Sequence, residues 1–200
     1  MKKQIILVHG GTTFDKYEDF WHFLENFTPS LEHLKKKKWR ESLQERLGSE
    51  FDVVSLKMPN KMNSNYDEWK VYFEKFIALF EEEVVLVGHS LGSLFLAKYL
   101  SENNFAKKIK ATFLIAPPFD DEKGESLGNF KMTKGLDNFA RQAGQIFIYY
   151  SEDDKVILPE DALKYKTHLP NAKVVVFQDR GHLSQEELPE LIEDIKKIYS

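Results

Sequence analysis

The sequence contains no cysteine and no long apolar run, and both absences exclude whole classes of structure. Without a thiol, the chain can form no disulfide, no thiolate nucleophile and no zinc–thiolate centre. A chain without disulfides suits a reducing compartment, so we expect a cytoplasmic protein. No stretch approaches the roughly 20 apolar residues that a bilayer-spanning helix needs. We therefore expect no membrane insertion.

The sequence also has no excess of basic residues. It has none of the common motifs for binding a metal ion or a phosphate. The formal net charge is -4, whereas a nucleic-acid binder normally presents a strongly basic face, so we expect no nucleic acid among the partners. There is no His-x-x-x-His pair, no ladder of aspartates and no Gly-Lys-Ser/Thr phosphate loop, so we expect no metal and no other cofactor. We interpret the basic run Lys35–Lys38 as a solvated face rather than an anion site.

Six short aliphatic runs, bounded by polar or turn residues, predict strands. Most are continuously apolar, which is typical of parallel strands buried on both faces. They are Ile5–Val8, Phe51–Leu56, Val84–Val87, Ile109–Ile115, Gln145–Tyr150 and Lys173–Phe177. Because helical patterns separate them, the order predicts an α/β fold with a mostly parallel, six-stranded sheet covered by helices on both faces. The length of 200 residues suits a single domain over residues 1–200.

Three patterns between or after the predicted strands predict helices clearly. An amphipathic stripe spans Trp69–Phe80, and Leu91–Leu100 is apolar nearly all round, which predicts a buried helix. A second amphipathic stripe spans Leu188–Ile195. Just before it, Ser184 and Glu187 have the spacing of a capping box, so we expect them to begin the last helix.

Two segments interrupt the alternation of strands and helices. Thr12–Lys37 contains six aromatic residues that predict a short extra helix, and Pro117–Ala143 is rich in glycine, aspartate and lysine. Both follow the carboxyl ends of strands, where ligands of open α/β sheets bind. They are therefore candidates for the walls of a substrate pocket, and the alternative is a surface loop with a core-packing helix.

The strand Val84–Val87 runs directly into Gly88-His89-Ser90-Leu91-Gly92, and an apolar helix follows. This is the G-x-S-x-G motif in its expected context of strand, sharp turn and helix. Glycines on both sides allow the strand and the helix to approach closely, and the turn exposes the serine hydroxyl. We predict that Ser90 is a catalytic nucleophile.

A serine hydroxyl needs a base and an orienting acid. In chains with such a turn, the acid and then the histidine follow the serine. His182 fits as the base because it lies after the last predicted strand and before the last helix. Asp154 follows the strand Gln145–Tyr150 and is the predicted acid, with Asp153 as the alternative.

Two backbone N–H groups should form an oxyanion hole for the negative charge of the transition state. One is predicted at Leu91, the residue after the nucleophile. The other should come from the loop after the first strand, His9-Gly10-Gly11-Thr12, where we place it at Gly11 with Thr12 as the alternative. We expect His9 to orient this loop, and His89 to lie at most at the edge of the pocket.

Nearly the whole chain resembles the small α/β-hydrolase serine hydrolases of the retinoblastoma-binding protein 9 type. The resemblance rests on the motifs around Ser90, Asp154 and His182, on His9-Gly10-Gly11, and on Met58-Pro59 followed by Trp69. It implies the α/β-hydrolase fold without a large cap domain. The long aromatic insert after Gly11 departs from the family pattern.

From the motifs and the resemblance, we predict a serine hydrolase of the carboxylesterase kind that cleaves ester, amide or thioester bonds of small acyl substrates. Ser90 would form an acyl-enzyme, with His182 and Asp154 completing a catalytic triad. The alternative is a binding or scaffold protein that keeps the fold but hydrolyses little, because a fold alone does not grant a function. Protein partners and the physiological substrate cannot be inferred from the sequence.

Overall fold

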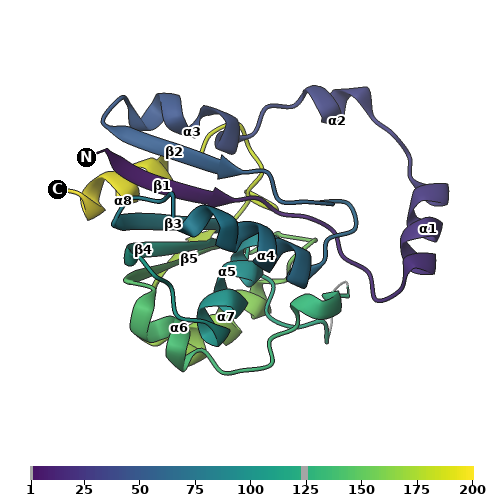
Figure 1. The fold of residues 1–200 in the computed structure, drawn as a ribbon. Coiled ribbons are helices and arrows are strands. Elements are labelled where there is room, and N and C mark those ends of the chain that lie inside the picture. Colours follow the sequence, from purple (N-terminus) through teal and green to yellow (C-terminus); the bar gives the residue numbers. More distant parts are fainter. Residues whose placement is uncertain (1, 123–125) are drawn as a thin grey trace.

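The computed structural model describes residues 2–122 and 126–200, and its centre is a six-stranded sheet (Figure 1). The strand order is β2-β1-β3-β4-β5-β6, and every neighbouring pair is parallel. The strands are β1 (Lys3–Val8), β2 (Phe51–Leu56), β3 (Glu83–His89), β4 (Lys108–Ile115), β5 (Gln145–Ser151) and β6 (Lys173–Phe177). All six predicted strands are confirmed, as is the parallel sheet.

Helices cover both faces of the sheet, as predicted, and each face has its own apolar core. Ile6 and Val8 of β1 pack in one core, whereas Ile5 and Leu7 pack in the other, because successive side chains of a strand point to opposite faces. Their complete burial explains the continuously apolar sequence of the central strands. The first core is covered by α4 (Tyr66–Ile77), α5 (Leu91–Glu102), α6 (Asp137–Gln142) and α7 (Pro159–His168), and the second by α3 (Trp39–Leu47) and α8 (Pro189–Ile198).

The predicted helices are present, with differences at their ends. The apolar stretch Leu91–Leu100 forms α5 and is buried throughout, as predicted. α4 begins before the apolar stripe because the Asn65 side chain accepts hydrogen bonds from the N–H groups of Asp67 and Glu68. It ends at Ile77, so the buried Phe80 packs from the loop that follows.

The predicted capping box of the last helix is wrong. The N-cap of α8 is Leu188, which makes no side-chain cap, and Pro189 occupies the first helical position, where a missing N–H costs nothing. The Ser184 hydroxyl instead donates to the carbonyl oxygen of His182. The serine therefore stabilises the loop around His182 rather than the helix.

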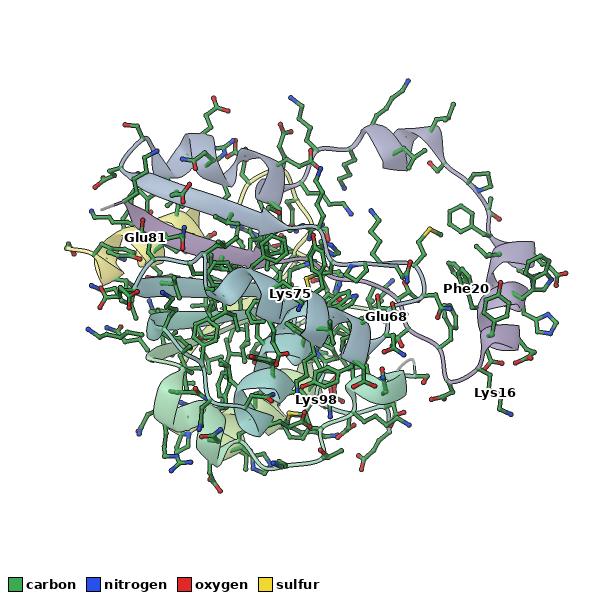
Figure 2. The ribbon with its side chains drawn as sticks, in the orientation of Figure 1. Lys16, Phe20, Glu68, Lys75, Glu81 and Lys98 are labelled. Atoms are coloured by element: carbon green, nitrogen blue, oxygen red, sulfur yellow. The ribbon has the colours of Figure 1, made fainter. Side chains whose placement is uncertain are left out.

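The aromatic insert forms α1 (Tyr17–Asn26) and α2 (Leu31–Lys35), which confirms the predicted extra helix. α1 has no buried residue, so it is not a core-packing helix. In Figure 1 it stands well apart from the sheet, and Phe20 in Figure 2 marks its place. The second interrupting segment contains the short helix η1 (Gly128–Phe130) and α6. Phe130 of η1 and Phe139 of α6 are buried in the core.

None of the helices in the described part of the chain is both long enough and apolar enough to cross a membrane.

Candidate active site

Ser90 occupies a strained turn between β3 and α5. Its φ of 55° and ψ of -128° are rarely adopted by a residue with a side chain, and such backbone strain costs on the order of 1–3 kcal/mol. The turn is held in place by a hydrogen bond of 2.8 Å from the Ser90 N–H to the carbonyl oxygen of Ile115. The strain is therefore built into the junction of β3, β4 and α5.

The two glycines of the motif allow this junction to close. A Cβ atom on Gly88 would lie 2.6 Å from the Cα of Ser93, and one on Gly92 would lie 2.3 Å from the carbonyl oxygen of Val8. Neither distance is compatible with a side chain. The glycines thus bring the start of α5 against β1 and β3, and the serine is left at the carboxyl edge of the sheet.

His182 and Asp154 are in direct contact. The Nδ1 atom of His182 lies 2.9 Å from Oδ2 of Asp154. Because a carboxylate only accepts hydrogen bonds, Nδ1 carries the proton in this contact and Nε2 is left with the free lone pair of a base. The other carboxylate oxygen of Asp154 accepts from the N–H groups of Val156 and Ile157, at 2.8 and 3.1 Å. The side chain of Asp154 is only 2% exposed, so these contacts fix its position.

The neighbouring acid, Asp153, has a different set of contacts. Its Oδ1 atom accepts hydrogen bonds from the Ser151 hydroxyl and from the Gly181 N–H, at 2.6 and 2.8 Å. These bonds lower the pKa of Asp153. Asp153 therefore ties the end of β5 to the loop that carries His182, and the imidazole itself is held by Asp154.

Ser90 and His182 line the same cavity, which has a volume of about 360 Å³. Gly11 and Leu91 also line it, whereas Asp154 lies behind His182. The Ser90 hydroxyl makes no hydrogen bond within the described part of the chain. Catalytic hydrogen bonds are often incomplete without substrate. A larger hollow of about 930 Å³ lies between the aromatic insert and the loop at residues 60–65, and it does not include Ser90.

The two predicted oxyanion donors, the N–H groups of Gly11 and Leu91, differ from the alternative at Thr12 in whether they already donate a hydrogen bond. Among the described residues, the backbone N–H groups of Gly11 and Leu91 donate no hydrogen bond, so both are available to a ligand in the cavity. The N–H of Thr12 instead donates to the carbonyl oxygen of Lys61 at 2.8 Å. Thr12 is thus occupied in this conformation.

His9 fixes the orientation of the peptide between Gly10 and Gly11. Its Nε2 atom accepts from the N–H of Met58 at 3.0 Å, so the proton is on Nδ1, which donates to the carbonyl oxygen of Gly10 at 2.6 Å. Burial lowers the pKa of His9, which favours this neutral form. Because N–H and C=O point in opposite directions across a trans peptide, holding the Gly10 carbonyl also aims the Gly11 N–H.

His89 is more than the pocket-edge residue that we expected. It is buried, and its Nδ1 lies 2.7 Å from an Nη1 atom of Arg40. A guanidinium only donates, so Nδ1 accepts and Nε2 donates to the carbonyl oxygen of His182 at 3.0 Å. Burial, followed by the charge of Arg40, holds the pKa of His89 well below its usual range. A neutral His89 therefore links Arg40 to the loop of the candidate base.

Arg40 is a site residue that the sequence does not reveal. It lies on α3, which begins at Trp39, and the indole N–H of Trp39 donates to the carbonyl oxygen of Leu183 at 2.8 Å. This bond holds the start of α3 against the His182 loop across 144 residues of sequence. A motif search reads neighbours along the chain, so it has no signal for this contact.

In the described residues, no group of three or more histidine, aspartate or glutamate side chains could hold a metal ion.

Comparison with known proteins finds serine hydrolases, the class that the sequence motifs predict. A family model described as "Serine hydrolase" matches residues 27–196. A relative in sequence is "Serine hydrolase RBBP9" of Rattus norvegicus, which is 23% identical over 151 residues, covering 74% of this chain and 78% of the relative.

Solved structures share the fold over almost the whole chain. The ydeN gene product of B. subtilis superposes with a TM-score of 0.78 and 17% identity, covering 99% of both chains. Est1E from Butyrivibrio proteoclasticus has a TM-score of 0.65 and 16% identity, covering 99% of this chain and 87% of its own. At these identities the likeness establishes the fold and leaves the reaction to be argued from the site.

Proposed function

The chain belongs to the serine hydrolase family, and we propose that it cleaves carboxylic ester bonds of small substrates, or the related amide or thioester bonds, through an acyl-enzyme on Ser90. The observation that carries the proposal is the 2.9 Å contact between Asp154 and His182 at the edge of the cavity that Ser90 lines. An imidazole held in this way presents its free nitrogen to a proton donor in the cavity.

In the proposed reaction the Ser90 oxygen attacks the acyl carbon while Nε2 of His182 takes the hydroxyl proton. Asp154 stabilises the imidazolium that results. The proton then passes from His182 to the leaving alcohol or amine as the bond to the acyl carbon breaks. A water molecule, deprotonated by His182 in the same way, attacks the acyl carbon of the acyl-enzyme. The proton then passes from His182 to the Ser90 oxygen as the bond between that oxygen and the acyl carbon breaks, which releases the acid and restores Ser90 and the neutral His182.

The N–H groups of Gly11 and Leu91 are the proposed donors to the oxyanion of each tetrahedral intermediate. Both face a cavity that also contains Ser90, and neither has another partner among the described residues. Losing one such donor typically costs about 2.7–4 kcal/mol of transition-state stabilisation. His9 would contribute indirectly, because it holds the peptide that carries the Gly11 N–H.

The size of the cavity supports small substrates. Its volume of about 360 Å³ is near the lower end of the range typical of ligand pockets. A panel of 4-nitrophenyl esters of increasing acyl length tests this point: we expect kcat/KM to be highest for short acyl groups. Activity that rises steadily toward long chains would contradict it.

A fluorophosphonate probe, which labels activated serines, tests the reaction itself. We expect the wild-type protein to be labelled and Ser90→Ala to be inert, whereas Ser49→Ala, at an exposed position, should be labelled like the wild type. Circular dichroism confirms that each variant is folded. Equal labelling of Ser90→Ala would refute the proposal, and a folded wild-type protein without labelling or turnover would favour the binding or scaffold alternative. The cytoplasmic location stays a prediction from the sequence.

A further inference from the structure

Three basic residues line the cavity that contains Ser90: Lys38 and Arg40, at the start of α3, and Lys61, in the loop after β2. Lys38 is the last residue of the basic run that we interpreted as a solvated face. Unlike Lys35–Lys37, which are exposed, it is partly buried. Its pKa is lowered, first by burial and then by the charges of Arg40 and Lys61. The three cations therefore converge on one wall, which we call the basic wall.

Among the described residues, none of these three cations forms an ion pair. The protein group that Arg40 contacts is the neutral imidazole of His89, which occupies one of the five N–H donors of a guanidinium. Lys38 and Arg40 are partly buried, whereas Lys61 is exposed. Partly buried charges are costly unless they are paired. The charge of Glu41 acts on both Lys38 and Arg40, but within the described residues it forms no salt bridge with either. The basic wall is thus suited to an anion that arrives from solution.

The cavity also has two acidic side chains, and they do not neutralise the basic wall. Asp120 forms an ion pair with Lys164 of α7. Burial, followed by the charge of Asp120, raises the pKa of Asp161 to about 6. No ion pair joins either acid to the basic wall within the described residues.

One member of the basic wall, Arg40, is held in place beside the reacting groups. Arg40 is anchored through Trp39 to the His182 loop, and its partner His89 directly precedes Ser90. An anionic group bound there would lie in the same cavity as the acyl carbon that Ser90 attacks. Guanidinium and ammonium groups are the usual partners of carboxylates and phosphates.

We propose that the enzyme prefers acyl substrates that carry an anionic group, a carboxylate above all, which the basic wall formed by Lys38, Arg40 and Lys61 binds next to Ser90. This inference rests on the proposed esterase function and adds the chemical class of its substrate.

The test compares two esters that differ in one charge: mono(4-nitrophenyl) adipate, whose free carboxylate is anionic, and its methyl-capped diester. For wild-type enzyme we expect kcat/KM to be about tenfold higher for the anionic ester, through a lower KM. In Lys38→Gln and Arg40→Gln this preference should fall at least threefold. Lys75→Gln removes the same charge from an exposed position on α4 (Figure 2) and should keep the wild-type preference.

The outcomes separate this inference from the proposed function. If both esters are hydrolysed equally well by the wild type, the inference is wrong and the esterase function stands. A loss of turnover on both esters in equal proportion would show that Arg40 and Lys38 act only in the structure, which also overturns the inference. Competitive inhibition of the neutral ester by hexanoate would support a carboxylate site, whereas inhibition by inorganic phosphate alone would move the preference to phosphorylated substrates and refute the carboxylate.

Discussion

At the scale of single residues, the two adjacent acids after β5 have separate contacts and should give separate phenotypes. Asp154→Asn would leave the side chain in place but remove the negative charge that, in the proposed reaction, stabilises the imidazolium of His182. We expect kcat to fall by roughly 10³–10⁴, with little change in the fluorescence-monitored unfolding curve.

Asp153→Asn is the matched control, since it changes the same charge one residue earlier. Its Oδ1 contacts are to Ser151 and Gly181, so the expected effect is a small loss of stability and less than about a tenfold loss of kcat. A larger drop in turnover for Asp153→Asn than for Asp154→Asn would reverse the assignment of the acid.

Asp161 should make stability depend on pH in the acidic range. Because burial raises its folded-state pKa from 3.8 to about 6, the folded protein binds the proton more tightly than the unfolded chain. The free energy of unfolding should therefore fall as the pH rises from about 4 to about 6, and level off above. We expect Asp161→Asn to be more stable than wild type by about 1 kcal/mol at pH 7, after allowing for its partial exposure.

Urea denaturation at several pH values measures this difference. The gap between wild type and Asp161→Asn should narrow strongly as the pH falls to 4 and close below the unfolded-state pKa of 3.8, where the wild-type carboxyl is protonated in both states. Asp179→Asn, on an exposed loop, should follow the wild-type pH profile. A constant gap from pH 4 to pH 7 would mean that the ionisation of Asp161 has no part in it.

The sequence allowed the candidate site residues that directly follow a strand to be predicted. It gave no indication of site residues that lie elsewhere, such as Arg40. Ser90, Asp154 and His182 each come soon after a strand, and the carboxyl ends of parallel strands share one edge of the sheet. The contact of Arg40 with His89 joins residues 49 positions apart on α3 and β3. It depends on how α3 packs, which no local pattern encodes.

At the scale of elements, the approach of α5 to β1 depends on Gly92. A Cβ atom there would meet the Val8 carbonyl oxygen at 2.3 Å, and this backbone cannot move without disturbing the sheet. We expect Gly92→Ala to reduce the free energy of unfolding by about 2 kcal/mol or more. Gly135→Ala is the control, because nothing lies within 4 Å of its Cβ position. Equal stabilities of the two variants in urea would show that α5 can shift at no cost.

The strands were easier to predict than the helices. Complete burial makes the central strands continuously apolar, which is visible in a short window of sequence. The helix α3, in contrast, buries only Trp39, Leu43 and Leu47 and is otherwise polar, so its pattern is weak. The capping box failed because the Ser184 hydroxyl found a partner in the His182 loop, a competition that only the folded chain decides.

At the scale of the whole molecule, the excursion that contains α1 and α2 contributes little to the core. No residue of α1 is buried, and its Tyr17 and Trp21 are 63% and 52% exposed. Segments with few buried contacts open at little cost and are cut first by proteases. We expect limited trypsin digestion to begin within Lys35–Lys38, about tenfold faster than at Lys131 or Lys134 in the other interrupting segment.

Mass spectrometry of the first fragments checks this order of cleavage. A variant with glutamine at positions 35, 36 and 37 should slow the first cut without changing the urea unfolding curve. First cleavage after Lys131 or Lys134 would show that the second segment, despite its buried Phe130 and Phe139, is the less stable one.

The excursion through α1 and α2 leaves the sheet just after Gly11 and returns at Lys38, and both of these residues border the cavity. A longer, shorter or differently folded excursion would reshape the entrance and redirect the side chains at its two ends, while every strand kept its register. Variation in which compounds such enzymes accept can therefore accumulate in one surface segment that adds little to the core, independently of the parts that perform the chemistry.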